Sequence, residues 1–145
     1  MRIFLDTNVL VSAVATRGLC TDVLREVLKS HRLIISLGLL SELERALRQK
    51  IRVPEELITE FIVLIQQESV LSAPGKSPRI ALRDRDDLEI LAAALNGKSD
   101  LFITGDMELL KLAKFQNLEI TSPRGFWDRL RSSTAPKLKR TGRRS

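Results

Sequence analysis

The sequence has little of what histidine- or cysteine-based catalytic centres require. Its 145 residues include one cysteine, one histidine and no tyrosine. A single cysteine excludes an internal disulfide framework and a zinc site built from several cysteines. A single histidine excludes most histidine-based metal sites and argues against a histidine-centred catalytic triad. Any metal site in this chain is therefore expected to use oxygen ligands.

Long apolar segments are also missing. Runs such as Leu33–Leu40 and Phe61–Ile65 are far shorter than the roughly 18 residues that a membrane-spanning helix needs. Asp6 interrupts the N-terminal segment where a secretion signal would have its apolar centre. We therefore expect no membrane association, and a reducing cytoplasm is the simplest location. The chain length suits a single domain with its own core.

Acidic residues are absent from the C-terminal segment. The chain has 24 lysines and arginines against 18 aspartates and glutamates, which gives a net charge of +6. Residues 131–145 hold six of the basic residues and no acid, so residues 1–130 carry equal numbers of both signs. The amphipathic spacing of apolar residues also ends after Leu130. We predict a neutral domain over residues 1–130 and a basic, disordered tail over residues 131–145.

Short apolar runs alternate along the chain with amphipathic segments. The runs predict strands over residues 2–6, 33–36, 70–72, 101–104 and 118–121. Helices are predicted over residues 9–15, 21–30, 39–49, 54–68, 86–96, 106–113 and 123–130, the first with Thr7 or Asn8 as its N-cap. This alternation is typical of an α/β fold with a parallel sheet, in which ligands bind at the carboxyl ends of the strands.

Polar side chains follow three of the predicted strands. Asp6 comes directly after the first strand and Ser36 ends the second. Thr104 and Asp106 follow the fourth strand, and Gly105 between them permits a tight turn. Because parallel strands end at the same edge of a sheet, we expect the two carboxylates to point toward one edge.

Two of the predicted helices are expected to bring further carboxylates to this edge. Asp87 shares the apolar stripe of its helix with Leu91, and a carboxylate on a buried face needs a partner. Glu42 and Glu44 lie on opposite sides of the apolar stripe of another helix, so the helical wheel alone does not choose between them. We favour Glu42, because it is nearer the helix start and hence nearer the end of the preceding strand.

The candidate site therefore consists of four carboxylates, those of Asp6, Glu42, Asp87 and Asp106. Converging acids raise one another's pKa unless a cation neutralises them. Oxygen ligands suit Mg²⁺ or Mn²⁺, and these ions serve phosphodiester hydrolysis well. Each residue alone has a plainer interpretation: Asp87 or Asp106 as a helix N-cap, Glu42 as a solvated charge and Asp6 as a turn residue.

Five segments resemble, in order and spacing, the motifs of the PIN-domain nucleases. They are Phe4–Val9, Ser36 with Leu40–Leu43, Asp86–Ala94, Asp100–Leu110 and Ile120–Phe126. The resemblance covers the chain from about residue 2 to residue 130. It implies a PIN-like three-layer α/β/α fold with a central parallel sheet of about five strands.

The resemblance also implies a divalent-metal-dependent endoribonuclease, with Mg²⁺ or Mn²⁺ as cofactor and RNA as substrate. The family's acids carry over as catalytic residues and metal ligands onto Asp6, Glu42, Asp87 and Asp106. Polar positions that support the metal site or the phosphate are matched by Thr7, Asn8, Ser36 and Thr104. The chain looks most like the VapC-like toxins of toxin–antitoxin pairs, which implies a cognate antitoxin protein and a homodimer.

Several roles stay open at this point. Glu108 is either a peripheral metal ligand through water or a first-turn acid favoured by the helix dipole. Arg79, Arg83 and Arg85 are either solvated loop residues or contacts for RNA phosphates. The tail is an RNA-attracting arm, a solubilising or partner-binding extension, or a permissive terminus. The alternative to an enzyme is a catalytically silent PIN module that acts as an RNA-binding or scaffold protein.

Overall fold

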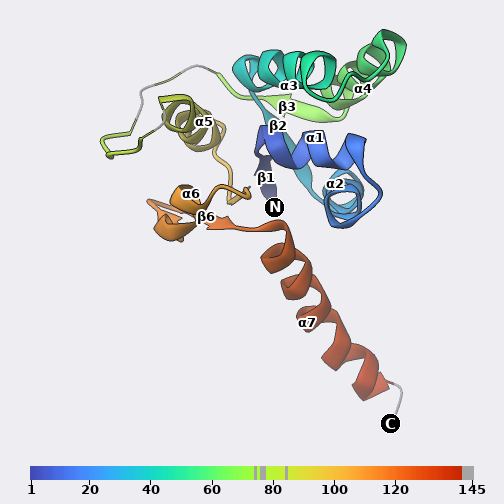
Figure 1. Ribbon diagram of the computed structural model, residues 1–145. Coiled ribbons are helices and arrows are strands. Elements are labelled where there is room, and N and C mark those ends of the chain that lie inside the picture. Colours follow the sequence, from blue (N-terminus) through green and yellow to red (C-terminus); the bar gives the residue numbers. More distant parts are fainter. Residues whose placement is uncertain (74, 76–77, 84, 142–145) are drawn as a thin grey trace.

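A six-stranded sheet forms the centre of the computed structural model, which describes residues 1–73, 75, 78–83 and 85–141 (Figure 1). Its strands are β1 (Arg2–Leu5), β2 (Arg32–Ile35), β3 (Ser69–Leu71), β4 (Leu101–Ile103), β5 (Lys114–Phe115) and β6 (Leu118–Thr121). The strand order is β3-β2-β1-β4-β6-β5. All neighbours pair in parallel except β5, which runs antiparallel to β6. The predicted parallel sheet of about five strands is confirmed.

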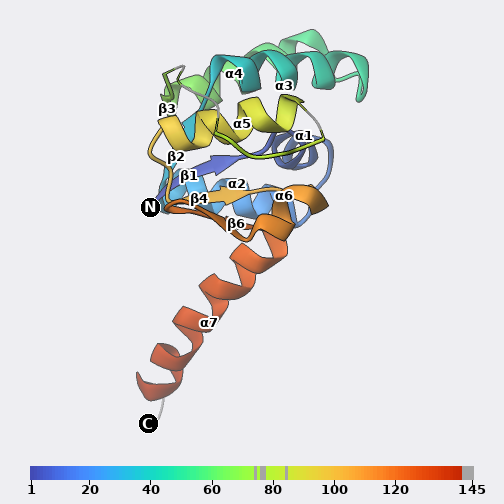
Figure 2. The same cartoon turned by 90° about the vertical axis from the view of Figure 1, so that its left-hand side faces the viewer.

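Helices cover both faces of the sheet and give the three-layer α/β/α architecture. They are α1 (Thr7–Ala15), α2 (Leu19–Ser30), α3 (Leu37–Gln49), α4 (Glu55–Gln67), α5 (Arg85–Asn96), α6 (Met107–Leu112) and α7 (Pro123–Thr141). Helices α1 to α4 lie on one side of the sheet and α5 and α6 on the other (Figures 1 and 2). Helix α7 packs its first turns against α2 and then leaves the body of the molecule.

The position of the central strands inside the core explains why their sequences are continuous apolar runs. Strands β1 and β4 lie in the middle of the sheet with helices on both faces, so their side chains are buried in both directions. Phe4 and Phe102 sit side by side on these strands, with ring centroids 5.6 Å apart in an edge-to-face arrangement. The two strands stay paired to their ends, because the Asp6 N–H donates to the Ile103 carbonyl at 3.0 Å.

The direction in which successive strands are added to the sheet reverses between the neighbouring strands β1 and β4. From β1 the chain passes to α1 on one face, whereas β4 is followed by α6 on the opposite face. The segments that leave the two strands therefore diverge and open a crevice at the carboxyl edge of the sheet. Asp6 and Asp106 stand at this point in the chain, directly after β1 and shortly after β4.

The structure corrects three details of the sequence prediction. Asp6, and not Thr7 or Asn8, caps α1, because the helix already begins at Thr7 and Asp6 is the extended residue before it. Strand β5 was not predicted, since two residues are too short to show an alternating pattern. The last helix continues to Thr141 instead of ending at Leu130.

Helix α7 extends into the segment for which a disordered tail was expected. The apolar spacing that stops at Leu130 marks where this helix leaves the core, because only the packed part needs an apolar face. The backbone of residues 131–141 is helical, and residues 142–145 lie outside the described part of the chain. The division into a nuclease domain of residues 1–130 and a separate tail stays a prediction. No helix within the described ranges is long and apolar enough to cross a membrane.

Candidate active site

Asp6 is a buried carboxylate held in one orientation by two hydrogen bonds. It is 8% exposed. Its Oδ1 accepts the Thr7 N–H at 2.7 Å, and its Oδ2 accepts the Thr104 hydroxyl at 2.6 Å. Burial raises the pKa of Asp6, and the charge of Asp106 raises it further, against the two hydrogen bonds that lower it. An ionised Asp6 therefore favours a positive charge nearby.

Thr104 links the two aspartates that follow the central strands. Its side chain is fully buried. The hydroxyl donates to Asp6 and accepts the Asp106 N–H at 3.0 Å. Asp106 in turn caps α6, since its Oδ1 accepts the N–H groups of Glu108 and Leu109 at 2.9 and 3.1 Å. The N-cap interpretation of Asp106 thus holds, and capping occupies only one of its two carboxylate oxygens.

Glu42 and Glu44, between which the sequence did not decide, have different surroundings on α3. Glu42 is half-buried and faces the crevice, where Asp6 and Asp86 are its charged neighbours. Burial raises the pKa of Glu42, and Asp6 and Asp86 add to this shift, although Arg45 lowers it. Glu44 forms an ion pair with Arg48 at 3.0 Å instead.

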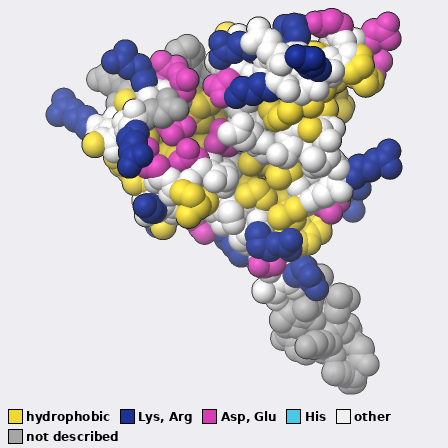
Figure 3. Space-filling model, in the orientation of Figure 1, with side chains coloured by type: hydrophobic (Ala, Val, Ile, Leu, Met, Phe, Trp, Pro, Cys, Tyr) yellow, Lys and Arg dark blue, Asp and Glu magenta, His cyan; other side chains and the backbone are white. Residues whose placement is uncertain are grey.

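The predicted carboxylates line one cavity of about 320 Å³, here called the acid cavity. Its lining residues are Asp6, Thr7, Asn8, Glu42, Arg45, Ala46, Gln49, Lys50, Asp86, Asp87, Ile90 and Asp106. The acids come from four elements that are remote in sequence: the ends of β1 and β4, helix α3 and the first turn of α5. Figure 3 shows acidic side chains gathered in the hollow between α3 and α5, with lysines and arginines on its rims.

The carboxylates that line the acid cavity are suitable ligands for a divalent cation, but they do not lie close enough together to coordinate one. Within the described ranges, no group of three acidic, histidine or cysteine residues stands close enough to hold a metal ion. Burial is the largest cause of the raised pKa values of Asp6 and Glu42, and neighbouring acids add to both shifts. The Thr7 hydroxyl is close enough to Glu42 to lower its pKa, yet this buried oxygen has no partner in hydrogen-bonding geometry. A cation or its water shell would supply that partner.

A second cavity, of about 470 Å³, is also bordered by Asp87 and Asp106; we call it the basic cavity after Arg83 and Lys111, which line it beside three acids. Its lining is completed by Arg83, Met107, Glu108 and Lys111. Of the three arginines proposed for RNA contact, only Arg83 lines it. Arg79 and Arg85 are exposed and line neither this cavity nor the acid cavity.

Glu108 has a contact that neither sequence interpretation included. Its carboxylate accepts the backbone N–H of Arg83, at 3.2 Å for Oε1 and 3.4 Å for Oε2. The contact ties the start of α6 to the segment that leads into α5 and Asp87. Glu108 is a first-turn acid of α6, and its contact with the Arg83 N–H also anchors this segment.

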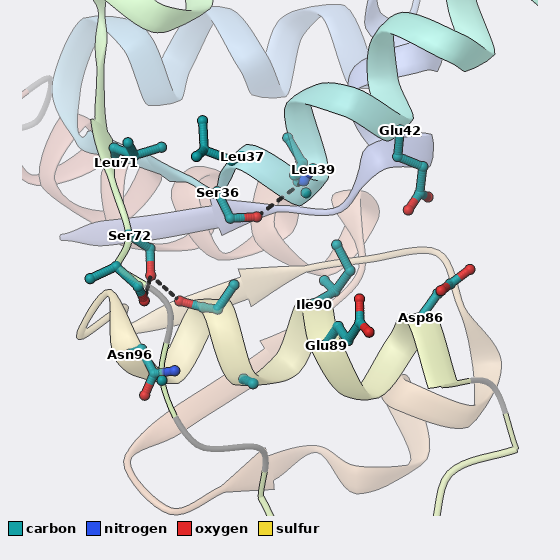
Figure 4. Close-up of a pocket in the computed structure, with 15 residues that line it drawn as sticks. Ser36, Leu37, Leu39, Glu42, Leu71, Ser72, Asp86, Glu89, Ile90 and Asn96 are labelled. Atoms are coloured by element: carbon teal, nitrogen blue, oxygen red, sulfur yellow. Dashed lines mark hydrogen bonds between the residues drawn. The ribbon is translucent and has the colours of Figure 1, made fainter.

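Of the four supporting residues, Ser36 and Thr104 do not line the acid cavity, and of these two only Thr104 has a hydrogen bond to one of its acids. Ser36 lies at the start of α3. It caps α3, because its Oγ accepts the Leu39 N–H at 3.1 Å. It also lines a neighbouring pocket of about 530 Å³ between α3 and α5 (Figure 4). Thr7 and Asn8 do line the acid cavity, and Thr104 acts on it through Asp6.

Sequence reasoning missed four polar or charged residues of the acid cavity: Arg45, Gln49, Lys50 and Asp86. Arg45 and Gln49 follow Glu42 at spacings of three and seven residues on α3, so helical periodicity would have found them. Asp86 lies outside the apolar stripe of α5 that includes Asp87, so the argument from burial on the stripe does not find it. That argument fails here because the crevice borders the edge of the stripe, and both Asp86 and Asp87 reach it.

The fold and the cavity together define an α/β protein with a carboxylate site at the switch point of a parallel sheet. A sequence profile of the PIN domain matches residues 2–108, which is most of the chain. The chain therefore belongs to the PIN domain family. No curated protein matches it closely enough to count as a relative.

Two solved structures show the same fold. One is VapBC2 from Rickettsia felis bound to a DNA fragment from its promoter: the TM-score is 0.61 at 17% sequence identity, and the match covers 84% of this chain and 98% of that chain. The other is VapBC-1 from nontypeable Haemophilus influenzae, with a TM-score of 0.59, 18% identity, and coverage of 86% and 99%. At these identities the similarity concerns the fold.

Proposed function

We propose that this protein is a divalent-metal-dependent endoribonuclease that hydrolyses RNA phosphodiester bonds. The observation that carries the proposal is the acid cavity, where Asp6, Glu42, Asp87 and Asp106 meet from four remote elements. Two of these acids have raised pKa values. Membership of the PIN domain family supports a nuclease, and Mg²⁺ or Mn²⁺ is the cofactor that carboxylate oxygens favour.

In this proposal the carboxylates of Asp6, Glu42, Asp87 and Asp106 would hold the metal. A bound divalent cation supplies a nucleophilic water at neutral pH and stabilises the charge of the phosphate. Thr104 keeps Asp6 oriented through its 2.6 Å hydrogen bond. No histidine, serine or cysteine lines the described acid cavity, which favours direct attack by water over a covalent intermediate. The expected products carry a 5′-phosphate and a 3′-hydroxyl.

The proposal assigns the RNA backbone to the basic side chains on both sides of the acids. Arg45 and Lys50 line the acid cavity, and Arg83 and Lys111 line the basic cavity. None of the four takes part in an ion pair with another described residue. The charges hold a strand across the carboxylates once the metal has reversed the local potential. Arg79 and Arg85 remain candidates only for contacts farther along the strand.

We further propose that the enzyme is the toxin of a toxin–antitoxin pair, with a cognate antitoxin protein as partner and a homodimeric assembly. The support is that both similar solved structures are described as VapBC proteins. Purification after co-expression with the neighbouring small reading frame tests the partner, and sedimentation tests the dimer. A cytoplasmic location stays a prediction from the single cysteine.

The test of the enzyme combines metal titration with RNA cleavage. Calorimetry should detect Mg²⁺ or Mn²⁺ binding to the purified protein, and end-labelled RNA should be cut only when the metal is present. Asp6→Asn should reduce cleavage by about a hundredfold or more. Glu55→Gln is the matched control, because Glu55 is an exposed acid paired with Arg48 far from the cavity.

Two outcomes contradict the proposal. Undiminished cleavage by Asp6→Asn or Asp87→Asn would show that the substituted acid is not part of the catalytic site. Absence of metal binding together with retained RNA binding would instead favour the catalytically silent RNA-binding or scaffold module.

A further inference from the structure

The pocket between α3 and α5 adjoins the acid cavity but differs from it in character. It has a volume of about 530 Å³. Leu37, Leu39 and Ile90 form apolar walls. Glu42 and Asp86 line both spaces, so the two adjoin at these acids. In Figure 4 these two acids stand at one end of the pocket and Ser72 and Asn96 at the other. We call this space the side pocket.

The distribution of charge separates the side pocket from the other two cavities. The acid cavity contains Arg45 and Lys50, and the basic cavity contains Arg83 and Lys111. No lysine or arginine is among the described residues that line the side pocket, whereas three carboxylates are. The three carboxylates disfavour a phosphate beside them, so the part of the side pocket that they line suits the uncharged part of a nucleotide.

The lining of the side pocket suits an unstacked nucleobase, and its volume is more than sufficient to hold one. Proteins that bind single-stranded RNA place splayed bases against apolar side chains and read the edge of the base with a few polar groups. Glu89 projects from α5 beside Ile90, is exposed, and forms no ion pair with another described residue. Its carboxylate can only accept hydrogen bonds, so it selects a base that offers donors.

Guanine is the base that offers two adjacent donors to a carboxylate, from N1–H and the exocyclic N2 amino group. Adenine and cytosine present one amino group next to an acceptor nitrogen, and uracil presents a single N–H between two carbonyls. Glu42 and Asp86 are committed to the metal side in the proposed function, which leaves Glu89 to read the base. The Ser36 hydroxyl, which accepts from Leu39, keeps its proton to donate to a base acceptor.

We infer that the side pocket binds a guanine base of the RNA next to the scissile phosphate, with Glu89 as the residue that determines base specificity. The inference rests on the proposed function, because the phosphate of that nucleotide has to lie at the metal. The shared lining by Glu42 and Asp86 suggests the arrangement: the backbone crosses the acids, and one base turns aside between α3 and α5.

Two variants test the side pocket, each with a matched control. Gly38 lines the pocket, and a Cβ at this position meets no atom within 4 Å, so Gly38→Leu fills the space without backbone conflict. Gly38→Ala adds only the Cβ and leaves the pocket open. Glu89→Gln replaces one acceptor by a donor, and Glu60→Gln changes an exposed acid on α4 outside the pocket.

The first experiment sequences the cut ends of a random RNA pool digested in Mg²⁺ or Mn²⁺. The wild type, Gly38→Ala and Glu60→Gln should cut with guanine enriched about tenfold at one fixed position beside the cleaved bond. Glu89→Gln and Gly38→Leu should lower this enrichment to about twofold or less while total cleavage falls far less. Absence of any enriched guanine, or equal enrichment in all five proteins, would overturn the inference.

The second experiment measures nucleoside binding by NMR saturation transfer and does not depend on cleavage. Guanosine should bind the wild type and Gly38→Ala at least about tenfold more tightly than adenosine, inosine or uridine, and Gly38→Leu and Glu89→Gln should lose the preference. Inosine lacks the N2 amino group, so equal binding of inosine would refute the role of Glu89. Much tighter binding of 5′-GMP than of guanosine would indicate a free-nucleotide site instead.

The two experiments separate failure of the pocket from failure of the proposed function. If the wild type cuts no RNA but selects guanosine, the proposed function is wrong, and only the selection of guanine by the side pocket is supported. If RNA is cut without base preference and guanosine does not bind, the base site falls alone. If Gly38→Leu changes the oligomeric state in sedimentation without changing base preference, the pocket is an interface between copies and the inference is wrong.

Discussion

Helix α3 carries two groups of charged side chains that are stabilised in opposite ways. In the first group, Arg48 forms ion pairs with Glu44 of the same helix and with Glu55 of α4. The Arg48 guanidinium lowers the pKa of the Glu55 carboxyl, chiefly through their hydrogen bond. Every acid in this group has a basic partner, and the surrounding water screens the rest of its charge.

The second group, on the crevice side, has acids in excess. Glu42 faces Asp6 and Asp86, and its pKa is raised where that of Glu55 is lowered. Arg45 is the nearby base that lowers the pKa of Glu42, and it is exposed. Glutamates two residues apart on one helix therefore differ in their surroundings, since Glu44 completes an ion pair while burial and the neighbouring acids raise the pKa of Glu42. In the proposed function, a divalent cation would complement the acids of the second group.

The largest expected effect comes from replacing Glu42 of the second group, with the replacement of Glu44 in the first group as its control. Glu42→Gln should reduce metal-dependent RNA cleavage by about a hundredfold, because it removes a charge from the metal site. Glu44→Gln should change cleavage by no more than about twofold, since this residue faces Arg48. Initial rates on labelled RNA at saturating metal measure both. Similar losses in the two variants would show that the contrast between the groups is not functional.

Metal binding should stabilise the folded protein, and more so at higher pH. Saturation at about 100 times the dissociation constant corresponds to about 2.7 kcal/mol. The folded pKa values of Asp6 and Glu42 are raised, so the folded protein holds more protons than the unfolded chain between the ordinary and the raised values. Without metal, the contribution of these groups to stability therefore falls as pH rises through that window.

Thermal unfolding with and without Mg²⁺ checks this prediction. The increase in midpoint should be larger at pH 8 than at pH 5, where protons compete with the metal for the same carboxylates. Asp6→Asn should abolish most of the increase, and Glu55→Gln should leave it unchanged because Glu55 lies outside the site. An increase that is independent of pH would count against the carboxylates as ligands.

The buried hydroxyl that orients Asp6 should matter for stability as well as for catalysis. Thr104→Val keeps the shape of the side chain but leaves Asp6 Oδ2 and the Asp106 N–H without their partner. We expect a loss of about 1–3 kcal/mol in the free energy of unfolding, measured by urea denaturation. Thr104→Ser should recover most of it, because the hydroxyl returns. Equal stability of Thr104→Val and the wild type would refute this role.

The smallest expected effect concerns RNA affinity. Replacing Arg45 and Lys50 together by alanine should lower the slope of log affinity against log salt by about 1.4, which corresponds to two phosphate contacts on a single strand. Arg48→Ala should leave the slope unchanged, because its charge is already paired. Fluorescence anisotropy with a labelled oligonucleotide in Ca²⁺ measures the slopes. An unchanged slope in the double variant would show that the RNA backbone does not contact Arg45 and Lys50.

Local signals were sufficient for most of the fold. The buried runs of β1, β2 and β4 and the periodicity of α3 to α5 appear in the sequence because each element must present apolar side chains to the sheet. Strand β5 and the continuation of α7 past Leu130 gave no such signal. The first is too short to form a pattern, and the second no longer packs against the core.

The candidate site was predictable in part for a similar reason. Asp6 and Asp106 follow strands, and the chain alone places them at the carboxyl edge of a parallel sheet. The parts missed were relations between elements: Asp86 beside Glu42, Glu108 holding the Arg83 backbone, and Ser36 turned toward the side pocket. No spacing within a single helix reveals such contacts.

The sequence by itself determined which chemistry is available: oxygen ligands, no histidine or cysteine centre, and carboxylates at the ends of predicted strands. Residue types and local periodicity suffice for that, because they act within one turn or one strand. Only the tertiary structure decided which acids lose water and share a cavity, and which pair with an arginine instead. Burial and the distance between charges depend on all the elements packed together, and these two quantities separate Glu42 from Glu44.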